Sequence, residues 1–252
     1  MSENRVSKSI RRYYINPKEV RRRTTLRKPV LLSDSKGNYI QRQITSEHCL
    51  NIIFFWQRLD CSRLYWLGRK HLPNKLDKEE KLTFYVWLGT CDLTYYEKST
   101  RFISLETDND SNIRYIIRKL KELKEIITAQ FVRSEVVFLE VPSLSIQHWN
   151  HSREHKNYKE FIEQDKKLEL QLDQLNIKIR ELNKSDNRSP RFMLDLWRGS
   201  KGHNKKYVTK TYTDLNLLEK DGMHPKPLLA RLWMCRIGTE TCSPIVFFQS
   251  WK

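Results

Sequence analysis

Two short polar segments, far apart in the chain, carry residue types that can form a nucleophile and its base. Ser35 directly follows an apolar run, and Asp221 precedes His224 by three positions near the end of the chain. A carboxylate bonded to histidine Nδ1 fixes the ring tautomer, so that Nε2 can take a proton from a serine hydroxyl. These residue types predict an activated serine, provided that the fold brings residues 35 and 224 together.

The segment around Ser35 has two interpretations. Gly37 can adopt the positive φ of a tight turn, which would present the hydroxyl and N–H of Ser35 at the end of a strand, toward a developing oxyanion. Alternatively, Ser33, Asp34 and Ser35 only form the turn and cap the helix that follows.

The other two polar turns also have two interpretations each. In the segment DGMHP, Asp221 and His224 form a hydrogen-bonded pair, or Asp221 only steers a turn in which Pro225 takes the first helical position. In the segment GTCD, Gly89 would allow a close approach to the backbone, and the side chain of Cys91 would point into the same cleft as Ser35. The alternative there is a turn that ends a strand and buries a thiol.

Short apolar runs alternate with longer helical patterns, as is typical of βαβ units. The predicted strands are 29–33, 49–56, 82–89, 134–142 and 191–197. The predicted helices are 63–73, 113–131, 158–182 and 226–236, with Ser62 and either Asp110 or Ser111 as N-caps. Right-handed crossovers then give an α/β/α sandwich around a five-stranded parallel sheet, with catalytic groups beyond the carboxyl ends of the strands. The apolar stripe of 158–182 predicts core packing, with a dimer seam as the alternative.

The chain has 252 residues, 47 lysines and arginines against 30 acidic residues, and a formal net charge of +17. Its length predicts one domain at 29–240, preceded by a basic arm at 1–28 and followed by a tail at 241–252. The arm has ten basic residues and two acidic ones, which favours contact with a polyanion such as nucleic acid. The alternative for this charge is a solvated protein surface.

The sequence also bears on location and cofactors. An N-terminal apolar leader and an apolar run of membrane-spanning length are both lacking, which predicts an intracellular protein of the cytoplasm or nucleus. The cysteines are odd in number, form no CxxC pair, and are therefore predicted to be reduced thiols without a metal site. They are Cys49, Cys61, Cys91, Cys235 and Cys242.

The order of these segments resembles the SGNH (GDSL-like) hydrolase family over most of residues 29–237. The family blocks GDS, GxND and DxxH are matched by SDS at 33–35, GTCD at 89–92 and DGMH at 221–224. The resemblance implies a flavodoxin-like sandwich with strand order 2-1-3-4-5 and no metal or organic cofactor. It also implies that Ser35 attacks an ester carbonyl, that His224 acts as base and then acid, and that Asp221 orients it.

The resemblance further implies an oxyanion hole, from which this chain departs. The family uses the N–H of the nucleophile, the N–H of a glycine after the second strand, and an asparagine side chain. Here Cys91 replaces the asparagine, and the second strand is followed by QRLD at 57–60, where a backbone N–H at 59 or 60 is the remaining donor. The predicted oxyanion and substrate-binding residues are Ser35, Asp60, Gly89 and Cys91. Loss of one such donor costs on the order of a hundredfold or more in turnover.

Two functions are therefore predicted. The first is a serine esterase that hydrolyses carboxylic esters or related acyl groups. The second is a weak or inactive esterase scaffold that binds nucleic acid or another polyanion through residues 1–28. Esterase-like domains of this family occur in proteins of some retrotransposons, which suggests a mobile element or a virus as the source.

Overall fold

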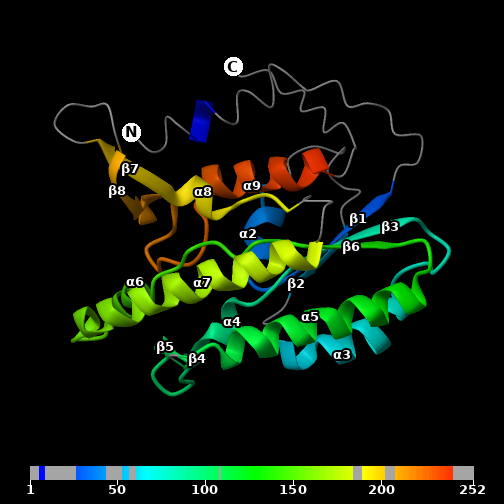
Figure 1. The fold of residues 1–252 in the computed structure, drawn as a ribbon, viewed down its shortest axis with the longest axis horizontal. Helices are drawn as coiled ribbons and strands as arrows, with labels where there is room; N and C mark the ends of the chain where they lie inside the picture. The colour runs from blue at the N-terminus through cyan, green and yellow to red at the C-terminus, as the bar shows by residue number, and fades with distance from the viewer. Residues whose placement is uncertain are drawn as a thin grey trace.

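Four parallel strands form the central sheet of the protein, described here from a computed structural model (Figure 1). The structure describes residues 6–8, 27–43, 53–56, 61–107, 109–183, 189–201 and 208–240. The strands of the sheet are β1 (Lys28–Ser33), β2 (Ile53–Trp56), β3 (Leu82–Trp87) and β6 (Glu135–Phe138). Their order is β2-β1-β3-β6. Because β6 is the fourth predicted strand, this order matches the first four positions of the predicted order 2-1-3-4-5.

The pairing register aligns the ends of the strands. Ser33 of β1 lies opposite Trp56 of β2 and Trp87 of β3. The turns that follow β1 and β3 therefore leave the sheet at the same edge, the carboxyl edge. Residues 34–35 and 88–89 form these two turns, so the sheet itself brings the segments SDS (33–35) and GTCD (89–92) to the same edge.

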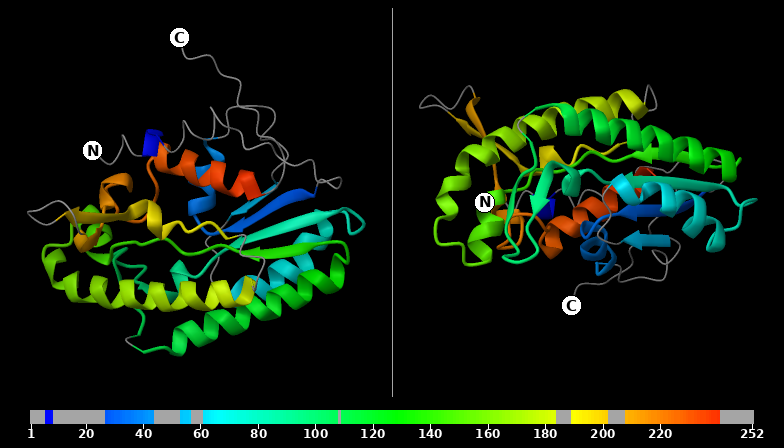
Figure 2. Two further views of the ribbon diagram at one scale, coloured as in Figure 1. Left: turned by 45° about the horizontal axis from the view of Figure 1, so that its top comes forward. Right: turned by 90° about the horizontal axis from the view of Figure 1, so that it is seen from below.

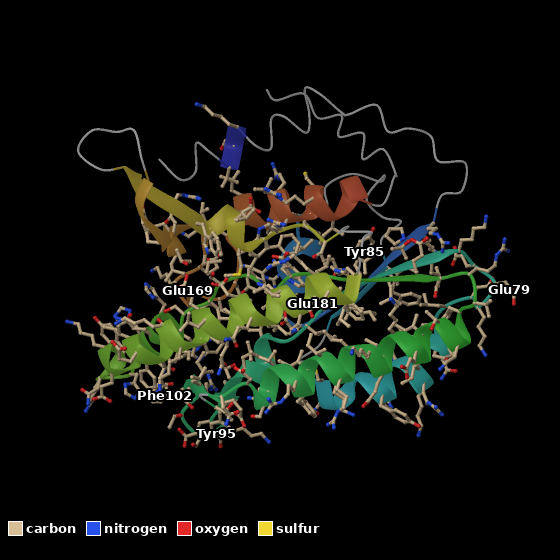
Figure 3. The ribbon with its side chains drawn as sticks, in the orientation of Figure 1. Glu79, Tyr85, Tyr95, Phe102, Glu169 and Glu181 are labelled. Carbon is tan, nitrogen blue, oxygen red and sulfur yellow. The ribbon has the colours of Figure 1, made fainter. Side chains whose placement is uncertain are left out.

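Helices cover both faces of the sheet, which gives three layers (Figures 1 and 2). One face packs against η3 (Leu67–His71), α5 (Ser111–Gln130) and α7 (Ile162–Asn183). The other packs against α2 (Lys36–Gln41), α8 (Met193–Leu196) and α9 (Pro227–Glu240). Successive side chains of β3 point to opposite faces of the sheet. Phe84 lies in the core cluster with α5 and α7, and Tyr85, labelled in Figure 3, lies in the cluster with α2 and α9.

The helices α5 and α7 form because their apolar residues recur at intervals of three and four positions. The buried apolar residues of α5 are Ile113, Ile116, Leu120, Leu123 and Ile127. Those of α7 are Leu168, Leu172, Leu175 and Ile179, and all lie in the same cluster as α5 and the sheet. The apolar stripe of 158–182 is thus core, as predicted, and the dimer-seam alternative is wrong for these residues. Asp110 is the N-cap of α5, but its side chain makes no capping bond within the described residues.

The predicted fifth strand at 191–197 is wrong. Residues 193–196 form α8, and the next residues form β7 (Trp197–Lys201), which pairs with β8 (Val208–Thr213) in an antiparallel hairpin. A seven-residue segment with five apolar residues does not distinguish a strand from a buried helical turn by periodicity. Among the described residues the parallel sheet therefore has four strands and not five. Thr213 of the hairpin donates a hydrogen bond to Glu169 of α7 at 2.7 Å, and Glu169 is labelled in Figure 3.

Several shorter elements were not predicted: α4 (Thr90–Leu93), β4 (Thr94–Tyr96), β5 (Ile103–Leu105), α6 (Ile146–Ser152) and η7 (Leu215–Leu217). Other short elements overlap the predicted helices 63–73 and 158–182: η2 (Cys61–Arg63), α3 (Leu64–Trp66), η3 (Leu67–His71), η4 (Leu72–Asn74) and η5 (Tyr158–Phe161). The helix predicted at 63–73 is a succession of such turns, from η2 through α3 to η4. Tyr95 lies in β4 of the hairpin β4–β5, and Phe102 directly precedes β5. Both residues are labelled in Figure 3.

Three observations concern termini, membranes and thiols. Val6, within the predicted basic arm, is buried in the core cluster that contains α9, whereas most of the arm lies outside the described residues. In the part of the chain that the structure describes, helices with the length and apolarity of a membrane span are lacking. Cys61, Cys91 and Cys235 are not in disulfides, and Cys49 and Cys242 lie outside the described residues.

Candidate active site

Ser35 lies in the turn that joins β1 to α2. It is the N-cap residue of α2, yet its hydroxyl makes no capping hydrogen bond in the described part of the chain. Asp34 stabilises the turn instead, because its Oδ1 accepts a hydrogen bond from the N–H of Lys36 at 3.0 Å. The hydroxyl of Ser35 faces His224, with 2.8 Å between Oγ and Nε2. Of the residues in this segment, Asp34 therefore binds the first N–H of the helix, whereas the hydroxyl of Ser35 does not act as a cap.

Asp221 and His224 form one tight turn ahead of α9. His224 Nδ1 lies 2.7 Å from Asp221 Oδ2, and Asp221 Oδ1 accepts the N–H groups of Met223 and His224 at 2.9 and 3.0 Å. With Nδ1 donating to the carboxylate, the lone pair of Nε2 faces the hydroxyl of Ser35, which is the tautomer of a general base. Asp221 therefore steers the turn and also pairs with the imidazole. The first residue of α9 is Pro227, so the alternative that placed Pro225 there is wrong.

The carboxyl group of Asp221 is more acidic than an ordinary aspartate. Burial raises its pKa, but hydrogen bonds from the imidazole and N–H of His224, with a further bond from Met223 N–H, outweigh burial and hold the pKa below its usual value. Asp221 is therefore ionised at neutral pH, where its negative charge favours the imidazolium form of His224 during proton transfer.

The lowered pKa of Asp221 predicts a pH-dependent loss of stability. The ionised carboxylate stabilises the folded state above the ordinary aspartate pKa of about 3.9, and this contribution disappears as pH falls through the lower folded-state pKa. We expect Asp221→Asn to lower the free energy of unfolding at pH 7, and the deficit to shrink below about pH 4. Urea unfolding of both proteins at pH 7, 4 and 3 measures this. A deficit that is constant over that range contradicts the prediction.

The turn is held against α6 by a glycine contact. Gly222 has a φ of +65°, a backbone conformation that favours glycine, and its carbonyl accepts a hydrogen bond from Ser145 N–H at 2.9 Å. A Cβ at this position would lie 2.5 Å from the Cβ of His148, so a larger residue would displace the turn. Ser145 is itself bonded to Asp165 of α7 at 2.6 Å, which anchors the support for His224 to the core.

Two aromatic side chains flank the imidazole. The ring of Tyr39, one helical turn after Ser35, stacks on His224 with centroids 4.4 Å apart and an interplanar angle of 16°. Trp149 of α6 lies 6.3 Å from the same ring, and its indole N–H donates to the carbonyl of Arg101 at 2.9 Å. His224 is only 7% exposed. These contacts restrict the orientation of the ring that faces Ser35.

A buried ion pair holds the turn that carries Ser35. Lys36 Nζ bonds to Asp34 Oδ2 and, at 2.7 Å, to the hydroxyl of Thr90 in the turn after β3. The side chains of Lys36 and Asp34 are each 3% exposed. The ammonium also lies 5.5 Å from the ring centre of Trp87. Neither Lys36 nor Thr90 was among the predicted site residues, because a lysine at the start of a helix is ordinarily solvated.

The predicted oxyanion and substrate-binding residues have different positions. The N–H of Ser35 has no acceptor among the described residues, as an oxyanion donor requires. Gly89, with a φ of +124°, is the N-cap of α4, and Cys91 is half-buried within α4. Asp60 and the backbone at 59 lie outside the described residues. The substrate-binding roles of Gly89, Cys91 and Asp60 stay predictions.

Two of the glycines considered for the site have packing roles. A Cβ at Gly89 would lie 3.2 Å from Leu175 of α7. Gly68, the glycine nearest to the second strand, packs under α5, where a Cβ would lie 2.8 Å from Ile126. The structure thus places Gly68 at a helix contact. Within the described residues, clusters of three or more side chains able to ligate a metal ion are lacking.

Comparison with known proteins gives one distant structural likeness to describe. The chain is similar to the crystal structure of a protein provisionally assigned as a GDSL-like lipase, from Parabacteroides merdae ATCC 43184. The identity is 12% and the TM-score 0.46, over 85% of this chain and 98% of that one. Protein-family models and curated proteins give no match. At this TM-score the likeness carries no functional inference, so function is inferred from the geometry of the side chains.

Proposed function

We propose that the chain is a serine hydrolase with an SGNH-type fold that cleaves carboxylic esters or related acyl groups. The single observation that supports this proposal most is the hydrogen-bond chain from Ser35 Oγ through His224 to Asp221, with contacts of 2.8 and 2.7 Å. A hydroxyl bonded to an oriented, neutral imidazole is the arrangement that activates serine as a nucleophile.

In the proposed reaction, Ser35 Oγ bonds to the acyl carbon while its proton moves to His224 Nε2. Asp221 stabilises the imidazolium that results. When the tetrahedral intermediate collapses, the bond between the acyl carbon and the leaving oxygen breaks, and His224 returns the proton to that oxygen. Water, deprotonated by His224, then attacks the acyl-enzyme and releases the acid with Ser35 restored.

The oxyanion of the intermediate needs at least two donors, and the N–H of Ser35 supplies one in this proposal. The second is proposed to come from the backbone at 59 or 60 or from the segment of Gly89 and Cys91. A thiol at 91 donates more weakly than an amide, so we expect slower turnover than in family members with asparagine there.

A fluorophosphonate probe tests the proposal directly, because its phosphonyl group bonds only to an activated hydroxyl. We expect native protein to be labelled on the peptide that contains Ser35, as mapped by mass spectrometry, and the Ser35→Ala variant to remain unlabelled. Protein unfolded in urea before the probe is added serves as the control for folding. Absence of labelling in native protein, or labelling at another residue only, would overturn the proposal.

The second predicted function, polyanion binding by the arm, is supported only by the charge of the sequence. Because nearly all of residues 1–28 lie outside the described part of the chain, the arm's ligand and a mobile-element source stay predictions.

A further inference from the structure

Two arginines reach the rim of the site through the aromatic rings that flank His224. The guanidinium carbon of Arg42, at the end of α2, lies 5.3 Å from the ring centre of Tyr39, which stacks on the imidazole. The guanidinium carbon of Arg153, at the end of α6, lies 4.8 Å from the ring centre of Trp149. Two separate helices therefore each hold a guanidinium group against an aromatic ring that flanks the imidazole.

The two guanidinium groups are available to a ligand. Both arginines are exposed, and in the part of the chain that the structure describes neither forms an ion pair with a carboxylate. Stacking on an aromatic ring restrains a guanidinium group while leaving its N–H groups to bind an anion. Such groups recognise carboxylates and phosphates through paired hydrogen bonds.

The charges of Arg42 and Arg153 both act on the phenol of Tyr39. Burial raises the pKa of the Tyr39 phenol, as do the charges of Asp221 and Glu219, whereas Arg42 and Arg153 both lower it. Asp221 and Glu219 are therefore the acidic side chains that oppose the arginines here, and Asp221 is bonded to His224 and to two backbone N–H groups.

We propose that Arg42 and Arg153 form a subsite for a carboxylate or phosphate, so that the enzyme prefers esters that carry a negative charge near the scissile bond. This inference depends on the proposed hydrolase function and specifies its substrate class. The two rings that hold the guanidinium groups have centroids 4.4 and 6.3 Å from that of the imidazole, so the proposed subsite adjoins the proposed nucleophile and base.

Two matched ester pairs measure the preference. In the first, p-nitrophenyl hydrogen adipate carries a carboxylate on the acyl side and p-nitrophenyl hexanoate does not. In the second, 4-acetoxybenzoate carries a carboxylate on the leaving group and 4-acetoxybenzamide does not. For each pair the ratio of kcat/KM, anionic over neutral, is compared between variants, so that intrinsic reactivity cancels.

We expect Arg42→Gln and Arg153→Gln each to lower this ratio about threefold, and the double variant about tenfold, in at least one pair. Arg42→Lys should retain most of the preference, because it keeps the charge. Glu219→Gln should raise the ratio. Addition of 0.5 M NaCl should weaken the wild-type preference, because salt screens exposed charges.

A matched control comes from the opposite edge of the sheet. Arg133 is exposed in the turn before β6, at the amino edge, so Arg133→Gln should leave the ratio unchanged. Equal ratios in wild type and the double variant, in both pairs, would overturn the subsite even if neutral esters are hydrolysed. If Ser35-dependent hydrolysis of every ester is lacking, the proposed function itself fails, and the subsite with it.

Discussion

Replacement of Ser35 by Ala is expected to reduce kcat/KM for p-nitrophenyl acetate by roughly a thousandfold or more. Loss of the nucleophile in a Ser-His-Asp set removes covalent catalysis, and only binding and oxyanion contacts remain. The hydroxyl of Ser35 contributes little to stability, because His224 is its only side-chain partner among the described residues. The measurement is initial-rate kinetics, with circular dichroism to show that the variant folds.

Ser33 provides a matched control for this variant, two positions away in the sequence. It is fully buried at the end of β1, and its Oγ has no hydrogen-bond partner in the described part of the chain. Ser33→Ala removes the same atom, so we expect turnover close to that of the wild type. Equal rates for wild type and Ser35→Ala would show that residue 35 is not the nucleophile.

Replacement of Lys36 by Met is expected to lower the free energy of unfolding by about 3 to 5 kcal/mol. This is the usual cost of removing one partner of a buried ion pair, because the other charge is left without compensation. Here that charge is the carboxylate of Asp34, and the bond to Thr90 is also lost. Urea unfolding followed by tryptophan fluorescence measures the change.

The double variant Asp34→Asn, Lys36→Met distinguishes charge from packing. Asparagine keeps an oxygen for the N–H of residue 36 and removes the negative charge, so the double variant should be more stable than Lys36→Met alone. Lys98→Met, at an exposed turn between β4 and β5, is the control and should change stability by less than about 0.5 kcal/mol. A loss of that small size for Lys36→Met would contradict the buried pair.

Much of the fold was predictable because it depends on local pattern. The four strands of the sheet are short apolar runs, and the helices α5, α7 and α9 have apolar residues at helical spacing. Each of these predicted elements lies within a few residues of the observed one where it is described. The segment 191–197 was misassigned because its five apolar residues suit a strand and a helical turn equally. The hairpins β4–β5 and β7–β8 lack a two-residue turn motif that would have predicted them.

Less of the candidate site was predictable. Tyr39 could have been found, since it lies four positions after Ser35 at the start of a helix and therefore on the same face. The positions of Trp149 and Arg153 beside the site had no local signal, because both come from α6, an element without a predicted site residue. Thr90 lies within the segment GTCD, which was predicted at this edge, but its bond to Lys36 was not predicted. The burial of Lys36 was likewise not predictable from a residue type that is ordinarily solvated.

The sequence by itself determined the residue types of the site, the alternation of strands and helices, and the position of each polar segment at the end of an element. Only the tertiary structure decided which side chains meet. Ser35 and His224 are 189 positions apart, and their 2.8 Å contact exists because the sheet, α6 and α9 hold two separate turns at one edge. Local patterns of apolar residues specify elements, whereas contacts between distant side chains depend on how those elements pack.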